Sequence, residues 1–391
     1  MHSNNSQGFD PNTTEDSPEL RPRPTLGLYV HLPFCRMRCT YCAFAVSTNR
    51  AMEDDYLEAL REEIRLRADR LSVVDSIFFG GGTPSMTSPL KLGAVGDALR
   101  DAYDIGPGTE FSMEANPEDV TADSLQAWRE LGVNRLSIGV QSLVDSELRP
   151  LARLHGGDRA VAALRAAVTA GFRTSGDLIL GLPGQTLATF RQSLRRVIDC
   201  GVEHVSLYML DLEEGTALQR NVLAGRTTLA PDEEVAEMYV VAVLETAAAG
   251  LTQYEISNFS RPGAQCLHNL RYWTRLPYVG LGLGAHSFQN EERVANSRIP
   301  EVYIDRLRKS ELPVDFREVL DEEERRHERI FLALRRSEGL EYADLVELCG
   351  GEGQEWCDRG IAEGWLQRWD GRVSLTTSGF LLSNEYISQL F

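Results

Sequence analysis

Residues Leu28–Phe44 read LYVHLPFCRMRCTYCAF. An apolar run of strand length leads into a loop that holds Cys35, Cys39 and Cys42. The spacing C-x3-C-x2-C supplies three thiolates, and on a four-iron cluster three thiolates leave one iron free to bind another molecule. Three structural thiols, or a zinc site completed by His31 or by a distant residue, are the alternatives. Zinc sites favour paired C-x2-C knuckles, and no second pair follows, so the stretch predicts a 4Fe–4S cluster.

Composition sets limits on the class of protein. The chain has 391 residues, of which 42% are hydrophobic and 25% charged, so it can bury one large core and a smaller one. A formal net charge of −18 argues against binding to nucleic acid or to anionic lipid. No apolar run approaches the roughly 18–20 residues of a membrane helix, and the N-terminus lacks a signal-peptide pattern. Seven cysteines, with three in one loop, indicate reduced thiols and a cytoplasmic location, while peripheral membrane association through a partner stays open.

Apolar runs of strand length alternate with helical segments through most of the chain. The expected strands are Gly27–His31, Asp75–Phe79, Glu110–Ala115, Arg135–Val140, Thr174–Leu180 and Glu203–Leu210. The expected helices include Met52–Arg70, Ala122–Leu131, Arg159–Ala170 and Thr186–Cys200. Repeated βα units predict an α/β fold, a parallel sheet curved into a partial (β/α)6 TIM-like barrel. Functional residues are expected at the C-terminal ends of the strands.

The chain is predicted to have three parts. Residues 1–24 are polar and proline-bearing, which is typical of a disordered tail. Residues 25–305 form the barrel, and residues 306–391 form a smaller α+β, winged-helix-like domain. In that domain Asp321–Arg336 predicts a helix, Trp365–Thr376 predicts a hairpin that turns at Asp370-Gly371, and Thr377–Leu390 predicts a closing helix. The acidic balance favours protein docking or a lid role over DNA binding for this domain.

Several polar residues follow or interrupt the expected strands. Gly80–Gly82 allow a sharp turn and close approach of the backbone to a ligand. Glu114 ends an otherwise apolar strand, and a buried carboxylate needs a polar partner. Gln141 holds the corresponding place on the next strand, and Asp177 lies within the strand after that. Polar residues on successive strands of one sheet would together form a polar floor for a nucleoside and its carboxylate and sulfonium groups.

Six segments carry a resemblance to a known family: YVHLPFCRMRCTYCAF, FFGGGTPSM, SMEANP, LSIGVQSL, DLILGLPGQT and CLHNLRYW. The cysteine loop and GGGTP resemble the radical SAM superfamily, in which S-adenosylmethionine (SAM) chelates the open iron. Together, the six segments resemble the family of HemN-type oxygen-independent coproporphyrinogen III oxidases and HemW-type haem chaperones, from about Leu26 to the C-terminus. The resemblance implies that the cluster is ligated by Cys35, Cys39 and Cys42. It implies SAM contacts from Tyr29, Tyr41, Gly81, Gly82, Thr83 and Glu114. Gln141, Arg153 and Asp177 match positions that bind a second SAM in the oxidases.

Three features separate the two branches of this family. The oxidases carry a further cysteine two residues after the third, where this chain has Phe44. Residues 268–273 contain HNxxYW, a signature of the chaperone branch, and the short N-terminal tail agrees with that branch. The resemblance therefore implies a haem chaperone that binds haem and passes it to acceptor haemoproteins. On this resemblance, no coproporphyrinogen oxidase activity is expected. The alternative function is the oxidative decarboxylation of coproporphyrinogen III. A third hypothesis is a radical enzyme that acts on another substrate.

The HNLRYW segment is the expected place of haem handling. Imidazole is a standard axial ligand of haem iron, and aromatic rings suit a flat macrocycle. By resemblance, His268 is the leading haem ligand. The alternatives are His286, His155, His204 and the thiolate of Cys266. Haem is then the cargo and a haemoprotein, membrane-associated or not, is the acceptor, while a homodimer is left open.

Overall fold

The computed structural model describes residues 25–391, and the predicted tail lies outside the described residues. A twelve-stranded sheet organises this part of the chain, in the order β12-β11-β10-β9-β1-β2-β3-β4-β5-β6-β8-β7. Its first six strands in sequence are β1 (Thr25–Leu32), β2 (Asp69–Gly81), β3 (Tyr103–Ala115), β4 (Arg135–Gln141), β5 (Arg173–Leu180) and β6 (His204–Met209). Each pairs in parallel with the next. The predicted run of six parallel strands is confirmed.

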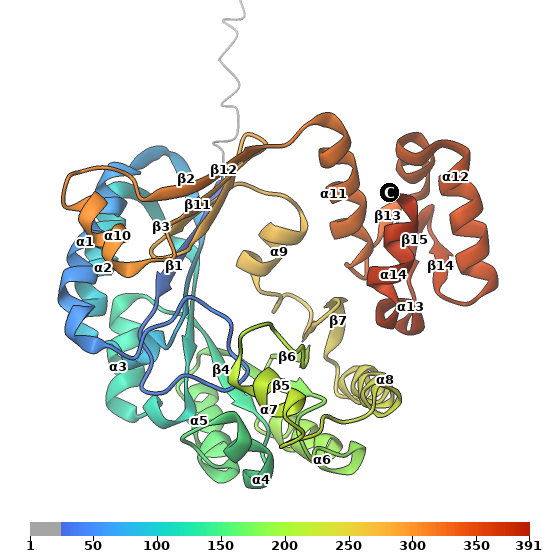
Figure 1. Ribbon diagram of the computed structural model, residues 1–391, viewed down its shortest axis with the longest axis horizontal. Helices are drawn as coiled ribbons and strands as arrows, with labels where there is room; N and C mark the ends of the chain where they lie inside the picture. The colour runs from blue at the N-terminus through green and yellow to red at the C-terminus, as the bar shows by residue number, and fades with distance from the viewer. Residues whose placement is uncertain (1–24) are drawn as a thin grey trace, which may run out of the picture.

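Helices cover the outer face of the curved sheet (Figure 1). They are α1 (Glu53–Leu66), α2 (Pro89–Ala102), α3 (Ala122–Leu131), α4 (Asp145–Leu148), α5 (Gly157–Thr169), α6 (Leu187–Ile198) and α8 (Asp232–Ala248). Helix α1 ends at Leu66, short of the expected Arg70, because β2 already begins at Asp69. The strands are apolar on the face that these helices cover, where Leu28 and Val30 of β1 and Leu136 and Ile138 of β4 are fully buried.

The sheet is open, so the partial barrel of the prediction is confirmed. Strand β9 (Tyr278–Leu281) adds a seventh parallel strand beside β1. Antiparallel strands then extend both sides: β10 (His286–Gln289), β11 (Glu292–Asn296) and β12 (Val314–Val319) on one, β8 (Asn258–Ser260) and β7 (Thr252–Glu255) on the other. Among residues 25–391, β12 and β7 remain as the edges. Helix α9 (Leu267–Trp273) lies within the curve of the sheet (Figure 1).

The C-terminal part has the predicted mixed α and β character. Its sheet of β13 (Leu340–Glu341), β15 (Arg372–Leu375) and β14 (Leu366–Trp369) packs with helices α11 (Glu322–Leu334) and α12 (Tyr342–Ala362). Gly350 interrupts α12 with a non-helical backbone. The hairpin turns at Asp370 and Gly371, both with positive φ, as predicted. The prediction of one continuous closing helix over Thr377–Leu390 is wrong. The helix is interrupted at Leu382, and this segment forms α13 (Thr377–Leu381), α14 (Ser383–Ile387) and the 3-10 turn η5 (Ser388–Leu390).

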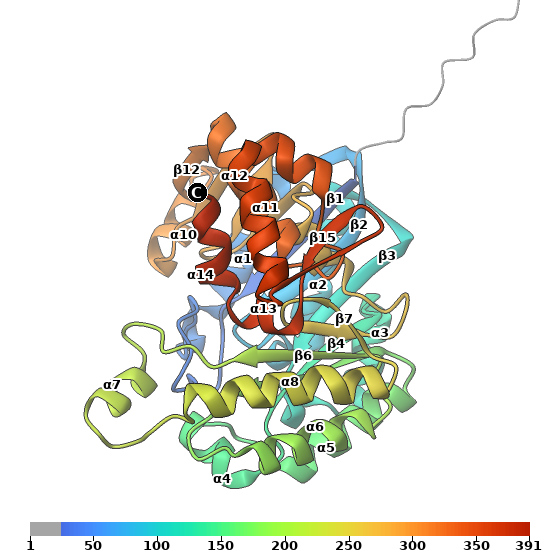
Figure 2. The same ribbon diagram turned by 90° about the vertical axis from the view of Figure 1, so that its right-hand side faces the viewer.

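The link between the two parts runs along the sheet edge. Helix α10 (Pro300–Leu307) is followed by β12, which pairs with β11, so the main sheet continues past residue 305. Helix α11 then crosses to the opposite edge of the sheet, where the C-terminal part lies beside β7 and α8 (Figure 1 and Figure 2). There the Ile256 amide donates to Arg335 O at 3.0 Å. The division at residue 305 stays a proposal. Within residues 25–391, no helix combines the length and the hydropathy needed to cross a bilayer.

Candidate functional site

One cavity of about 610 Å³ lies over the C-terminal ends of the parallel strands. Every residue that the sequence predicted for cofactor binding lines it: Tyr29, Cys35, Cys39, Tyr41, Cys42, Gly81, Gly82, Thr83, Glu114, Gln141, Arg153, Asp177 and His268. These residues are far apart in the chain, and the parallel sheet brings them together at the C-terminal ends of its strands. Their proximity is thus a structural fact, while their individual roles stay predictions.

The cysteine loop follows β1 and lies along one wall of this cavity. Cys35 is buried, and Cys39 and Cys42 are partly exposed. The Thr83 hydroxyl donates to Cys35 Sγ at 3.5 Å, and Arg153 Nη1 donates to Cys39 Sγ at 3.5 Å. Burial raises the pKa of the Cys35 thiol to about 11, partly offset by the Thr83 hydrogen bond. A bound metal reverses that balance, because a coordinating thiol is deprotonated.

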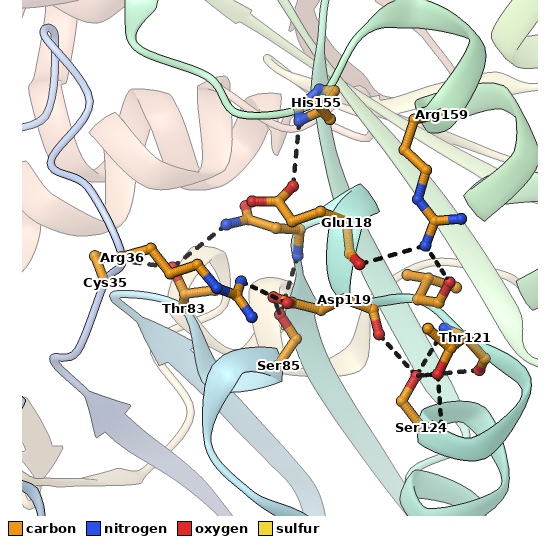
Figure 3. A network of polar contacts seen from close by, with 12 residues as sticks. Cys35, Arg36, Thr83, Ser85, Glu118, Asp119, Thr121, Ser124, His155 and Arg159 are labelled. Carbon is orange, nitrogen blue, oxygen red and sulfur yellow. Dashed lines mark hydrogen bonds and ion pairs between the residues drawn. The ribbon is translucent and has the colours of Figure 1, made fainter.

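Polar contacts fix the base of the cysteine loop (Figure 3). Arg36 forms an ion pair with Asp119, and the Ser85 hydroxyl donates to the other oxygen of Asp119 at 2.7 Å. Asp119 belongs to the turn η3 (Pro117–Asp119) after β3, and Ser85 to the turn η2 (Pro84–Met86) after β2. The loop after β1 is therefore tied to the turns after the next two strands.

The glycine turn after β2 approaches the cysteine loop closely. Gly81 has φ of 106°, a backbone conformation that favours glycine. The Gly82 amide donates to Leu32 O at 2.8 Å, and the Thr83 amide donates to Phe34 O at 2.9 Å. A Cβ on Gly82 would lie 2.6–2.8 Å from backbone atoms of residues 32–34. The absence of side chains at this turn thus permits the packing of the two loops.

Two partly buried carboxylates, Glu114 on β3 and Asp177 on β5, face the cavity from the strands on either side of β4. Glu114 accepts the Gly81 amide at 3.1 Å, and burial, with the charge of Asp177, raises its pKa to about 7. Asp177 accepts hydroxyl hydrogen bonds from Ser137 at 2.7 Å and from Ser175 at 2.9 Å. Burial raises the pKa of Asp177 despite these hydrogen bonds. The polar partners expected for these carboxylates are present, and both can accept from a cationic ligand.

Arg153 joins the cysteine loop to the strands. Its Nη2 donates to Asn116 Oδ1 at 2.8 Å and to Gly139 O at 2.7 Å, while its Nη1 reaches Cys39. Gln141 ends β4 with φ of 63°, which is uncommon outside glycine, and the register with β5 shifts there. A guanidinium held this way can position an anionic group beside the cluster loop.

Both ring nitrogens of His268 are already hydrogen-bonded within the protein. It is fully buried, and its ring stacks on Phe78 and Tyr29. Its Nδ1 is hydrogen-bonded to Ser76 Oγ at 3.1 Å and its Nε2 to Tyr272 OH at 2.9 Å. Burial, and then Arg271, lower its pKa to about 3, so the ring is neutral. To bind iron, His268 would first have to release one of these two partners.

The alternative haem ligands are dispersed. His204 and Cys266 also line the main cavity, whereas His286 lines a second one. His155 lies outside the residues that line either cavity; its Nε2 bonds Val140 O at 3.1 Å and its Nδ1 lies 3.5 Å from Glu118 (Figure 3). The structure therefore does not gather these candidates at one point.

Sequence reasoning missed several residues that line the main cavity. Six of them occupy every second position of β4 and β6, two strands that face the cavity: Arg135, Ser137, Gly139, His204, Ser206 and Tyr208. His204 had been considered only as a haem ligand. Successive strand residues point to opposite faces, so polar residues at alternate positions of an apolar strand were a signal that could have found them.

The donor set fits a 4Fe–4S cluster with an open iron. Three thiols reach one cavity, glycine backbone lies beside them, and partly buried carboxylates and an arginine complete the wall. Over residues 25–391, no group of three or more His, Cys, Asp or Glu side chains is arranged around one point as for a single metal ion. The cluster assignment therefore depends on the count and place of the thiols and on the class of protein.

The fold and this site define a radical SAM protein. Residues 29–197 match the family described as the Radical SAM superfamily. A solved structure titled coproporphyrinogen III oxidase (HemN) from Escherichia coli, a radical SAM enzyme, aligns with a TM-score of 0.82 at 23% identity and covers 94% of this chain and 90% of that chain. At that identity the similarity shows the fold. Membership of the class implies SAM and a 4Fe–4S cluster.

Similarity over the whole chain narrows the class to one family. The chain is 36% identical over 382 residues to heme chaperone HemW of Mycobacterium tuberculosis (strain ATCC 25618 / H37Rv), covering 95% of this chain and 97% of that protein. It is 35% identical over 369 residues to heme chaperone HemW of Bacillus subtilis (strain 168), covering 91% and 97%. The chain belongs to the HemW family, which confirms the branch predicted from Phe44 and HNxxYW.

Proposed function

We propose that this protein is a haem chaperone that binds haem and transfers it to acceptor haemoproteins. The observation that carries the proposal is the near full-length similarity to proteins named heme chaperone HemW. The similarity to an oxidase structure concerns the fold, and the chain has Phe44 in place of the further cysteine of the oxidases. Among the alternatives, the chaperone is therefore favoured over coproporphyrinogen oxidation.

The proposal assigns the cofactors to residues of the main cavity. Cys35, Cys39 and Cys42 would hold the cluster, whose open iron supplies a site for SAM and for electron transfer. The SAM contacts would come from Tyr29, Tyr41, Gly81, Gly82, Thr83 and Glu114, with Gln141, Arg153 and Asp177 further along the floor. Glu114 would accept a hydrogen bond from the amino group of SAM, and the glycine turn would let that group approach the backbone.

The partners follow from the same proposal. Haem is the cargo, and the acceptor is a haemoprotein, which can be membrane-associated. The net charge of −18 opposes nucleic acid as a partner. All seven cysteines are free, in keeping with a cytoplasmic location. A homodimer also belongs to the proposal.

The proposal predicts haem uptake without oxidase activity. Anaerobically reconstituted, dithionite-reduced protein would receive SAM and coproporphyrinogen III, and a parallel sample would be titrated with haem. We expect stoichiometric haem uptake, followed by absorbance, and no protoporphyrinogen by chromatography. Steady formation of protoporphyrinogen and methionine would instead identify an oxidase.

SAM binding is predicted to strengthen as the pH rises from 6 to 8. With a pKa of about 7, the Glu114 carboxyl is mostly protonated at pH 6 and mostly ionised at pH 8. The ionised form accepts a hydrogen bond from the SAM amino group, so the affinity for SAM should increase about tenfold over this range. Equilibrium dialysis with labelled SAM measures it, and Glu114→Gln should bind weakly with a flat profile. A pH slope that survives in Glu114→Gln would assign it to another group.

A further inference from the structure

A second cavity of about 380 Å³ lies on the far side of one wall of the cofactor cavity. Tyr29, Phe44 and Tyr272 line both cavities and so form the wall between them. The second cavity is completed chiefly by Tyr278, His286 and Arg298, the last two being exposed. None of its lining residues is acidic. It is therefore an aromatic and cationic recess in a strongly acidic protein.

The imidazole of His286 distinguishes this recess. Within residues 25–391, the other histidines each have a hydrogen bond or ion pair from a ring nitrogen: His31, His155, His204, His268 and His327. His286 alone among the described histidines has neither, and its side chain is exposed at the start of β10. Desolvation by the walls of the recess, followed by the charges of Arg298 and Arg293, lowers the pKa of His286, which favours the neutral form that ligates metals.

The other groups of the recess suit a flat, anionic macrocycle. Phe44 is 64% exposed and lines the recess, so its ring is available to a flat apolar ligand. Tyr272 and Tyr278 meet edge to face with ring centroids 4.7 Å apart, which presents a rigid aromatic surface. Arg298 donates to Ala43 O at 3.2 Å, and it has no carboxylate partner among the described residues. Its remaining donors are available to a carboxylate of a ligand.

We propose that the second cavity is the haem site, with His286 as the axial ligand of the iron, Phe44, Tyr272 and Tyr278 against the macrocycle, and Arg298 on a propionate. This inference rests on the proposed chaperone function and assigns its cargo to a site. It places haem beside the cofactor cavity, separated by Tyr29, Phe44 and Tyr272. It also gives Phe44 and the tyrosine of HNLRYW a common role as walls of the haem site.

Haem can bind at His286 without the rearrangement that binding at His268 would require. Binding at His268 would require loss of its Ser76 or Tyr272 hydrogen bond within a fully buried stack of rings. His286 needs no such rearrangement, and an exposed ligand allows the cargo to leave toward an acceptor. On this inference His268 is a positioning residue, because its hydrogen bond fixes the Tyr272 ring in the wall of the haem site.

The test compares haem titrations of four reconstituted holoproteins: wild type, His286→Ala, His268→Ala and the control His327→Ala in the C-terminal part. Ferric haem is added anaerobically and the Soret band is recorded as a difference spectrum. We expect His286→Ala to weaken binding at least tenfold and to shift the Soret band, and millimolar imidazole to restore the band position. His327→Ala should match the wild type, and cluster absorbance should be unchanged in all four.

Three results would overturn the inference. If His286→Ala binds haem with the affinity and the spectrum of the wild type, His286 is not the axial ligand. A tenfold loss of haem affinity and a shift of the Soret band in His268→Ala alone would assign the axial ligand to the main cavity. That result would still agree with the chaperone function. Failure of the wild type to bind haem rejects the proposed function itself, and this site with it.

Discussion

Replacement of Cys39 by alanine is expected to abolish the 4Fe–4S cluster while the sheet stays folded. Each of the three thiolates ligates a different iron, so losing one leaves two irons without a protein ligand. Cys39 is partly exposed, and its Sγ accepts a hydrogen bond from Arg153. The variant therefore removes little packing. We expect the brown absorbance and the iron and sulfide content to fall to background after anaerobic reconstitution.

Cys349→Ala is the matched control for this variant. Cys349 is also partly exposed and lies in α12 of the C-terminal part, away from the cavity. It should retain a full cluster, and circular dichroism should show the same helix content for both variants. A full complement of iron in Cys39→Ala would show that the ligands have been wrongly assigned.

The sequence predicted those parts of the fold that depend on local pattern. Apolar runs mark β1, β4, β5 and β6 within a few residues, because the face of each strand that the helices cover is apolar. Strand β3 begins at Tyr103, seven residues before the expected Glu110. Strand β2 begins six residues before the expected Asp75, since its first half is polar and partly exposed. The four-residue strands β9 and β10 went unpredicted because they are short. Strand β9 pairs with the distant β1, and β10 forms a hairpin with β11.

The same distinction applies to the site. The cysteine spacing and the glycine turn are local signals, and the residues they predicted do line one cavity. The engagement of His268 with Ser76 and the existence of the second cavity depend on where β2, β9 and β10 lie relative to α9. Such long-range contacts leave no pattern in one sequence. That is why His268 and His286 could not be separated before the structure was known.

Gly82→Ala should disrupt both the fold and the cofactor site, in contrast to a glycine-to-alanine change elsewhere. A Cβ at Gly82 would lie 2.6 Å from Pro33 C and 2.8 Å from Leu32 O and Phe34 O. These are backbone atoms, which cannot rotate away, so the glycine turn and the cysteine loop must separate. The Gly82–Leu32 and Thr83–Phe34 hydrogen bonds would then be strained or lost. We expect a loss of about 3 kcal/mol in the free energy of unfolding, as for severe overpacking of a core.

Gly93→Ala provides the comparison, because it makes the same chemical change where there is room. Gly93 lies in α2, and a Cβ there meets nothing within 4 Å. Alanine should stabilise the helix by about 0.5–1 kcal/mol. Urea unfolding of both apoproteins gives the free energies, and iron content after reconstitution reports on the site. We expect Gly93→Ala to hold a full cluster and Gly82→Ala to hold less than half of one. Equal stability of the two variants would mean that the cysteine loop and the glycine turn can separate without cost. Gly82 would then be needed only for the close approach of a ligand.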